Sequence, residues 1–147
     1  MKRRLIVFAV ALLLTILAAT TLAGCSAEAA EETYNDNAKI VKSSSSAEVG
    51  ATRMLTAAKF SYSANKFSGV KQVKKLNLPE NPTFKDVKLT ITGGKFKIVL
   101  VKDGEVYLLT DENIDGNIDM KLKAGNYVLK IVGVEAKVDL SMSLAFG

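Results

Sequence analysis

The chain has 147 residues and a formal net charge of +5, from 20 basic and 15 acidic side chains. It contains no histidine, no tryptophan and a single cysteine, Cys25. These counts exclude Ser-His-Asp and Cys-His catalytic arrangements, histidine-ligated zinc and any intramolecular disulfide bond. A folded domain in this chain must therefore be held together by its hydrophobic core.

The first 25 residues have the three parts of a bacterial export signal. Three basic residues, Lys2 to Arg4, precede an apolar run from Leu5 to Leu17, and Leu22-Ala23-Gly24-Cys25 closes the segment. Such an order of basic, apolar and small residues is typical of a secretory signal peptide. The segment resembles the signal peptide of bacterial lipoproteins, and its last four residues match the lipobox of that family.

The resemblance implies that residues 1–24 are removed and that Cys25 becomes the lipidated first residue, with acyl chains such as palmitate. The chain would then be held on the extracytoplasmic side of the cell membrane by this lipid anchor. Two alternatives stay open. The apolar run from Leu5 to Ala23 is nearly as long as the roughly 20 residues that span a bilayer, so it could be retained as an anchor. An ordinary secreted protein, cleaved after Ala23 or Gly24, is the other.

Removal of the signal changes the charge of the chain. Without Lys2, Arg3 and Arg4 the 20 basic residues fall to 17 against 15 acidic ones, so the net charge falls from +5 to +2. A strongly basic surface is the usual mark of a nucleic-acid-binding domain. The sequence therefore predicts no nucleic-acid partner.

Residues 25–57 are predicted to be a flexible tether behind the lipidated cysteine. Small and polar residues dominate this stretch, including four consecutive serines at 43–46. Segments of this composition bury too little apolar surface to fold by themselves. A flexible coil of about 30 residues would hold the rest of the chain on the order of 30 Å from the membrane.

From residue 58 to 147 the hydrophobic period changes to two. The clearest alternation runs from Val134 to Phe146, and Asp103-Gly104 between two apolar runs is a tight-hairpin signal. Short alternating runs separated by turn residues predict an all-β, antiparallel β-sandwich that folds by itself from about Ala58. About eight strands are expected, near residues 58–64, 69–78, 85–92, 95–102, 105–110, 117–123, 126–132 and 134–146.

Two stretches of this domain carry a second resemblance. They are Phe60–Ser63 with Phe67–Gly69, and the run from Leu122 to Gly133. Together they resemble the C-terminal β-sandwich of small lipoproteins of Gram-positive bacteria. The spacing of Lys123, Gly125 and Tyr127 is also similar to the pre-peptidase C-terminal type of domain. The resemblance implies a jelly-roll-like sandwich and no catalytic residue.

One acidic run has the spacing of a calcium loop. Residues 111–119 follow the first nine positions of an EF-hand-type loop, with oxygen ligands at alternate positions and glycine at the sixth. Leu122 replaces the bidentate acid, so Asp103 or Asp139 would have to complete the shell. The alternative is a polar connection whose residues simply make turns. The candidate calcium ligands are Asp111, Asn113, Asp115, Asn117 and Asp119.

No residue of the mature chain is organised for catalysis, so the sequence predicts a non-catalytic protein. It would act either as an envelope-structural or interaction module, or as a module that binds a glycan or peptide, with calcium as a possible cofactor. Tyr107, out of step with its neighbours in the strand pattern, is the best candidate for an exposed ring. A contiguous exposed apolar patch would favour the interaction module. A concave pocket lined by Tyr107 and polar groups would favour the ligand-binding module.

Overall fold

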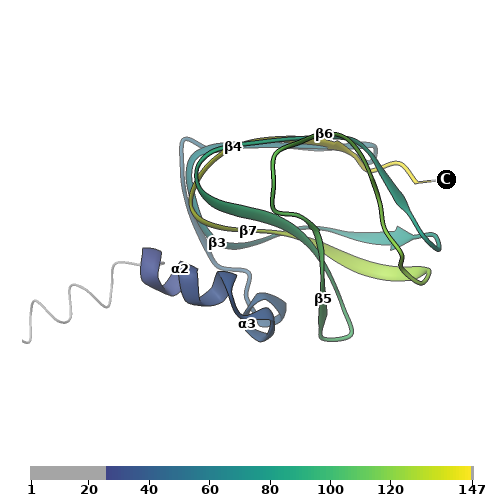
Figure 1. Cartoon of the computed structure of the whole chain (residues 1–147), viewed down its shortest axis with the longest axis horizontal. Coiled ribbons are helices and arrows are strands. Elements are labelled where there is room, and N and C mark those ends of the chain that lie inside the picture. Colours follow the sequence, from purple (N-terminus) through teal and green to yellow (C-terminus); the bar gives the residue numbers. More distant parts are fainter. Residues whose placement is uncertain (1–25, 147) are drawn as a thin grey trace, which may run out of the picture.

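The computed structural model describes residues 26–146, which form two short helices and seven strands (Figure 1). The helices come first and all the strands follow them. Their bounds are α2 Ala27–Tyr34, α3 Asn37–Lys42, β1 Ser46–Val49, β2 Thr52–Leu55, β3 Lys59–Leu78, β4 Thr83–Lys102, β5 Glu105–Thr110, β6 Ile114–Asp119 and β7 Gly125–Ser143.

The strands form one antiparallel sheet with β7 at its centre, between β3 and β4. The short strands β2 and β1 pair with successive parts of β3, while β6 and β5 pair with successive parts of β4. The three long strands bend near their middles, so their two halves lie in two layers that face each other (Figure 1). One continuous sheet thereby builds a sandwich-like fold.

Glycines allow the long strands to bend at the same level of the sheet. Gly69 pairs with Gly133, and the register of β4 against β7 shifts on both sides of Gly93. Gly94 has a positive φ of 67°, and a Cβ atom there would lie 2.3 Å from the carbonyl oxygen of Glu135. Residues with a Cβ rarely adopt this conformation, and none fits so close to backbone. The bend therefore depends on glycine in β4.

The space between the two layers is filled by one large apolar cluster. Alternation of side chains along each strand sends every second residue into it, as the period of two predicts. Its largest fully buried members are aromatic or branched, and aromatic rings from β3 and β4 contact one another in edge-to-face geometry. They include Phe60, Tyr62, Phe67, Phe84, Leu89, Phe96, Leu129 and Leu140.

The predicted all-β, antiparallel sandwich-like fold is confirmed. The hairpin at Asp103-Gly104 is also confirmed, because both residues have positive φ and Lys102 pairs with Glu105. The strand count differs from the expected eight, because three pairs of predicted strands are continuous. The glycines that separate the members of each pair bend a strand and do not end it.

The prediction of a flexible tether over residues 25–57 is wrong for residues 27–55, which form α2, α3, β1 and β2. The two short strands are edge strands of the sheet, and the helices lie under its lower layer (Figure 1). A second apolar cluster joins α3 to the outer face of this layer: Ile40, Val70, Val99, Val101 and Val132. These residues gain their apolar partners only in the folded sheet, so local composition did not reveal them.

Lysine side chains on the outer face of this layer hold the helices in place by donating hydrogen bonds to backbone carbonyl groups at the C-terminal ends of the helices. The ammonium of Lys130, a residue only 5% exposed, donates hydrogen bonds of 3.0, 3.1 and 3.0 Å to the carbonyls of Ile40, Val41 and Ser43. Cations are favoured at helix C-termini, where carbonyl groups lack intrahelical partners. Burial lowers the pKa of Lys130, and the three carbonyl oxygens offset part of that cost.

Helix α2 is held in the same way. Lys97 donates a 2.7 Å hydrogen bond to the carbonyl of Tyr34, at the last residue of α2, and its ammonium lies 4.3 Å from the centre of the Tyr34 ring. Lys95 forms an ion pair with Glu31. The domain boundary expected at residue 58 therefore falls inside one packed unit that begins at α2.

Candidate functional site

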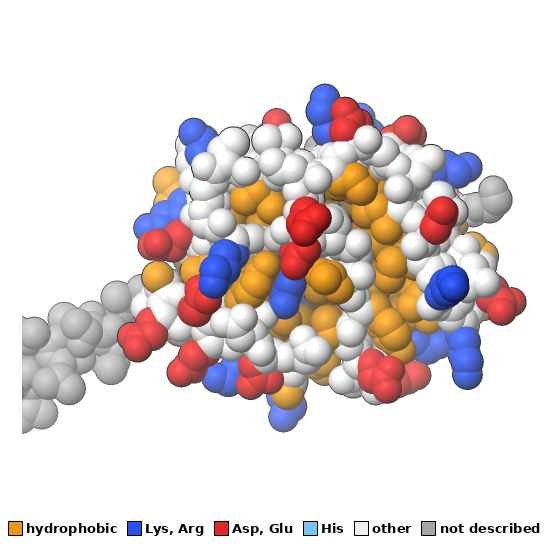
Figure 2. All heavy atoms as spheres, in the orientation of Figure 1, with side chains coloured by type: hydrophobic (Ala, Val, Ile, Leu, Met, Phe, Trp, Pro, Cys, Tyr) orange, Lys and Arg blue, Asp and Glu red, His pale blue; other side chains and the backbone are white. Residues whose placement is uncertain are grey.

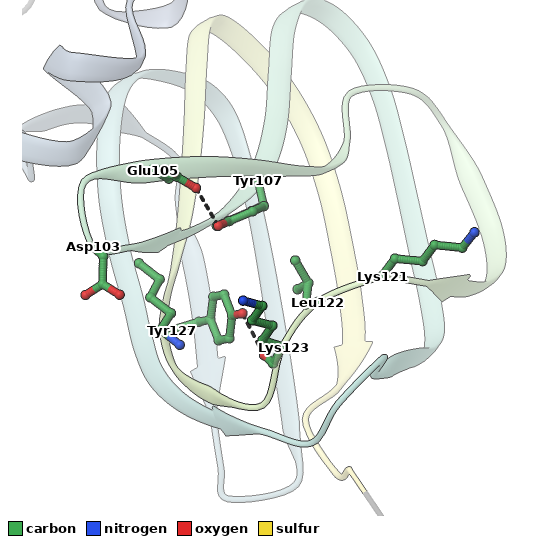
Figure 3. Close-up of a pocket in the computed structure, with 8 residues that line it drawn as sticks. Asp103, Glu105, Tyr107, Lys121, Leu122, Lys123 and Tyr127 are labelled. Carbon is green, nitrogen blue, oxygen red and sulfur yellow. Dashed lines mark hydrogen bonds between the residues drawn. The ribbon is translucent and has the colours of Figure 1, made fainter.

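A pocket of about 320 Å³ opens at the end of the sandwich opposite the bend. The β4–β5 hairpin forms one wall, and the segment that leads into β7 forms the other (Figure 3). Its lining residues are mostly charged or aromatic: Lys102, Asp103, Glu105, Tyr107, Lys121, Leu122, Lys123 and Tyr127. This Tyr107 pocket is the candidate functional site.

Two tyrosines form the floor of the pocket. Tyr127 is buried, and its hydroxyl donates a 2.7 Å hydrogen bond to the backbone carbonyl of Lys123, four residues upstream. Such a bond ties a strand to the turn before it, as in the tyrosine corner of sandwich proteins. The ring of Tyr107 lies 5.9 Å from that of Tyr127, at 75°. The buried ring of Tyr127 therefore fixes the position of the half-exposed ring of Tyr107.

The half-exposed ring of Tyr107 also has a fixed hydroxyl. Its hydroxyl donates a 2.7 Å hydrogen bond to the carboxylate of Glu105, two residues away on the same face of β5 (Figure 3). This bond, with a smaller contribution from burial, raises the pKa of the Tyr107 phenol. The phenol therefore stays protonated near neutral pH and serves as a hydrogen-bonding group.

Three lysines give the rim of the pocket a positive charge. The ammonium of Lys102 lies 5.0 Å from the centre of the Tyr127 ring, while Lys121 and Lys123 are exposed. Asp103 and Glu105 supply the opposite charge on the hairpin side. The arrangement can bind a ligand by stacking, hydrogen bonds and charge. It holds no histidine or thiol that could act as a nucleophile or as a base near neutral pH.

The candidate calcium residues lie on and beside an extended strand. Residues 114–119 form β6, and its exposed side chains at 115, 117 and 119 alternate along one face. Oxygen atoms of this run accept hydrogen bonds from β4: Asn113 from the Ile91 amide at 2.7 Å, Asn117 from the Asp86 amide at 3.0 Å and Asp119 from the Thr83 hydroxyl at 2.6 Å. The wrapped loop expected for residues 111–119 is therefore replaced by edge-strand pairing.

The other acids proposed for the calcium shell lie elsewhere. Asp103 is in the β4–β5 turn, and Asp139 is on an exposed position of β7. Over residues 26–146, no group of three or more Asp, Glu, His or Cys side chains is close enough to hold a metal ion. Calcium binding by Asp111, Asn113, Asp115, Asn117 and Asp119 stays a prediction that these positions do not support, and calorimetric titration tests it.

Cys25 and the rest of the lipobox lie outside the described residues. Between Ser26 and Phe146, no helix is long and apolar enough to cross a membrane.

Large exposed apolar side chains occur at both edges of the sheet. Val49, Met54 and Leu55 lie on β1 and β2, while Leu108 lies on β5. Figure 2 shows hydrophobic side chains across the middle of the β5–β6 side, with a few charged side chains among them and more charged side chains around the periphery. Of the two features that distinguish the functional classes, the pocket around Tyr107 is the more clearly organised.

Sequence reasoning singled out Tyr107 and missed its partners. Lys102, Lys123 and Tyr127 line the same pocket although about 20 residues separate the hairpin from the turn before β7. The sequence signals were present as two turns, Asp103-Gly104 and Ala124-Gly125. Nothing in the spacing of those turns showed that they meet at one end of the sandwich.

The fold and the pocket define the chain as an all-β, sandwich-like protein with a polar aromatic site at one end. No protein-family model matches the sequence, and neither a curated protein nor a solved structure shows significant similarity to it.

Proposed function

We propose that this chain is a lipid-anchored, extracytoplasmic β-sandwich lipoprotein that acts as a non-catalytic binding module of the cell envelope. The observation that carries the proposal is Leu22-Ala23-Gly24-Cys25, which places the only thiol of the chain at the end of an export signal. Two or more acyl chains hold a protein stably on a membrane, since each buried CH₂ contributes about 0.8 kcal/mol.

Cys25→Ser should abolish anchoring, because serine lacks the thiol that carries the lipid. We expect the variant to remain as unprocessed precursor or to leave the membrane fraction, while Thr21→Ser, outside the four-residue motif, behaves as wild type. Membrane fractionation and intact-mass analysis make the measurement. A wild-type mass without acyl chains, or with residues 1–24 retained, would refute the anchor.

The Tyr107 pocket favours ligand binding over a purely structural role. A pre-formed hollow with a few convergent polar groups and aromatic faces is the usual form of a small-ligand site. Tyrosine rings stack on sugars and on planar groups, and the lysines around them complement a carboxylate or phosphate. We propose an anionic glycan or a peptide with a free carboxylate as the ligand. Extracytoplasmic location would give the pocket access to such groups in the wall.

Tyr107→Ala should weaken this binding at least about tenfold, because it removes one aromatic face and a hydroxyl, and buried aromatic contacts of this kind contribute about 1–3 kcal/mol. The control is Leu108→Ala, the next residue of β5, which is 49% exposed and does not line the pocket. NMR titration of the soluble protein spanning residues 26–147 with soluble peptidoglycan fragments makes the measurement.

The expected shifts centre on Tyr107, Tyr127 and Lys123 and disappear in Tyr107→Ala alone. Shifts confined to another surface, equal affinity in both variants, or no shift at millimolar ligand would contradict the pocket as the site. Turnover of the fragments by the wild-type protein would contradict a non-catalytic function.

A further inference from the structure

The start of α2 is fixed beside the bend of the sheet. The Ser26 hydroxyl caps the helix by accepting a 3.2 Å hydrogen bond from the Ala29 amide, and Ala30 is 2% exposed. Two lysines of β4 hold the rest of α2 through Glu31 and the Tyr34 carbonyl. The first described residue of the chain is thus part of the packed domain.

This placement leaves no room for a spacer behind the proposed anchor. Consecutive Cα atoms of a trans peptide are about 3.8 Å apart, so a lipidated Cys25 would lie within one residue of the capped helix. A flexible coil of about 30 residues would have allowed the domain to stand off by about 30 Å and to rotate freely. A single residue between the anchor and the capped helix allows neither that distance from the membrane nor free rotation of the domain.

We infer that the domain lies directly against the bilayer, with the bend of the sheet facing the lipid headgroups and the Tyr107 pocket facing away from the membrane. The inference rests on the proposed lipid anchor and adds an orientation to it. The membrane-facing surface, called the bend surface below, is the hollow next to the helix start, lined by Ser26, Ala27, Ala47–Val49, Lys66, Ser68 and Glu135.

The chemistry of the bend surface suits a lipid headgroup layer. Its two acids are paired with lysines, Glu135 with Lys66 at 3.1 Å and Glu48 with Lys71. Each of these pairs has no net charge, so the bend surface repels anionic lipids less than free carboxylates would. Val49 on the same surface is an apolar residue that is 60% exposed. Burial of Val49 in the interface would remove that exposed apolar area from water.

The opposite end of the sandwich carries the ligand-binding groups. The β4–β5 hairpin and the turn before β7 lie there, together with the loop between β3 and β4 that contains Glu80. Figure 1 shows α2 beside the bend and the C-terminal end of the chain on the far side. An anchor at the bend therefore presents the pocket to the wall side, where a large ligand can reach it.

Site-specific fluorescence on the lipidated full chain tests the orientation. Cys25 would be consumed by its thioether, so Val49→Cys and, as the control at the far end, Glu80→Cys each introduce one reactive thiol for an environment-sensitive dye. The lipidated proteins are reconstituted in vesicles of phosphatidylethanolamine and phosphatidylglycerol. Quenching is measured with a nitroxide-headgroup lipid and with aqueous iodide.

The dye at position 49 should be quenched about twofold or more by the nitroxide lipid and be shielded from iodide, because groups in the interface lie about 5–10 Å deep. The dye at position 80 should respond to iodide alone. A 20-residue Gly/Ser insertion after Cys25, with a reach of about 25 Å, should remove the difference between the two positions.

The outcomes separate the orientation from the anchor. Equal iodide access at both positions in protein that carries acyl chains by intact mass overturns the orientation and leaves the anchor standing. A stronger lipid signal at position 80 overturns it as well. Protein without acyl chains overturns both.

Discussion

Leu140→Asp should unfold the protein. Leu140 is 1% exposed in the central strand β7, where it lies opposite Tyr62 of β3 and Leu89 of β4, each also 1% exposed. Loss of a buried leucine alone costs about 2–5 kcal/mol, and an unpaired carboxylate in the same place adds a further desolvation cost. Since small domains are stable by only about 5–15 kcal/mol, the variant should lose its β-sheet spectrum.

The matched control for this substitution is three residues away on the same strand. Lys137 is exposed on the solvent face, so Lys137→Ala should change the free energy of unfolding by about 0.5 kcal/mol or less. Circular dichroism and urea denaturation of the protein spanning residues 26–147 compare the two variants. Equal tolerance of both substitutions would contradict the side-chain alternation on which the core depends.

That alternation explains why the strands and the core could be predicted from the sequence. Residues such as Val138, Leu140 and Met142 alternate with polar neighbours, and a period of two assigns each to one face wherever the strand goes. The ends of the strands could not be predicted from this alternation. Gly93-Gly94 has the composition of a turn, yet both residues lie inside β4, and Gly94 has no room for a side chain because the Glu135 carbonyl of β7 lies directly beside it. Whether a glycine ends a strand or lies at a bend within it depends on the neighbouring strand.

The N-terminal segment shows a second limit of local composition. Ile40 and Val41 form a short apolar pair between lysines, and the partners of Ile40, Val70, Val99 and Val132, come from three different strands. Lys130 looks like a solvent-facing residue of β7, but the carbonyls at the end of α3 surround its ammonium. The residues that neighbour Ile40 and Lys130 in the sequence do not indicate either contact.

The acidic run does not form the wrapped loop expected of an EF-hand-type site, for a related reason. Asn113, Asn117 and Asp119 have the spacing of metal ligands, and the same spacing serves an edge strand whose polar side chains accept hydrogen bonds from β4. The Tyr107 pocket could be predicted only in part from the sequence. Tyr107 stands out in the strand pattern, whereas its partner Tyr127 follows the core alternation of its strand, and Tyr127 is buried in the structure.

The fragment spanning residues 58–147 should be far less stable than the protein spanning residues 26–147. The sequence predicts that the shorter fragment folds by itself, and the structure gives reasons to expect otherwise. Without residues 26–57 the buried valines at 70, 99 and 132 become exposed on the outer face of the sheet, and β3 loses both of its edge partners. Fully burying such a side chain contributes about 1.5–3 kcal/mol, so the combined loss is comparable with the whole stability of a small domain.

Ile40→Asp in the longer protein separates the contribution of the helices from that of the edge strands. Ile40 is fully buried between α3 and the sheet, so a carboxylate there should detach α3 while β1 and β2 stay paired with β3. We expect an intermediate urea midpoint, a retained β-sheet spectrum and increased binding of a hydrophobic dye, whereas Lys75→Ala, at an exposed position of β3, should match wild type. If the 58–147 fragment unfolds at the same urea concentration as the 26–147 protein, the N-terminal segment is an accessory to the sandwich. A midpoint lowered in the order wild type, Ile40→Asp, fragment makes it part of the fold, because each step removes more of the apolar surface that the segment covers.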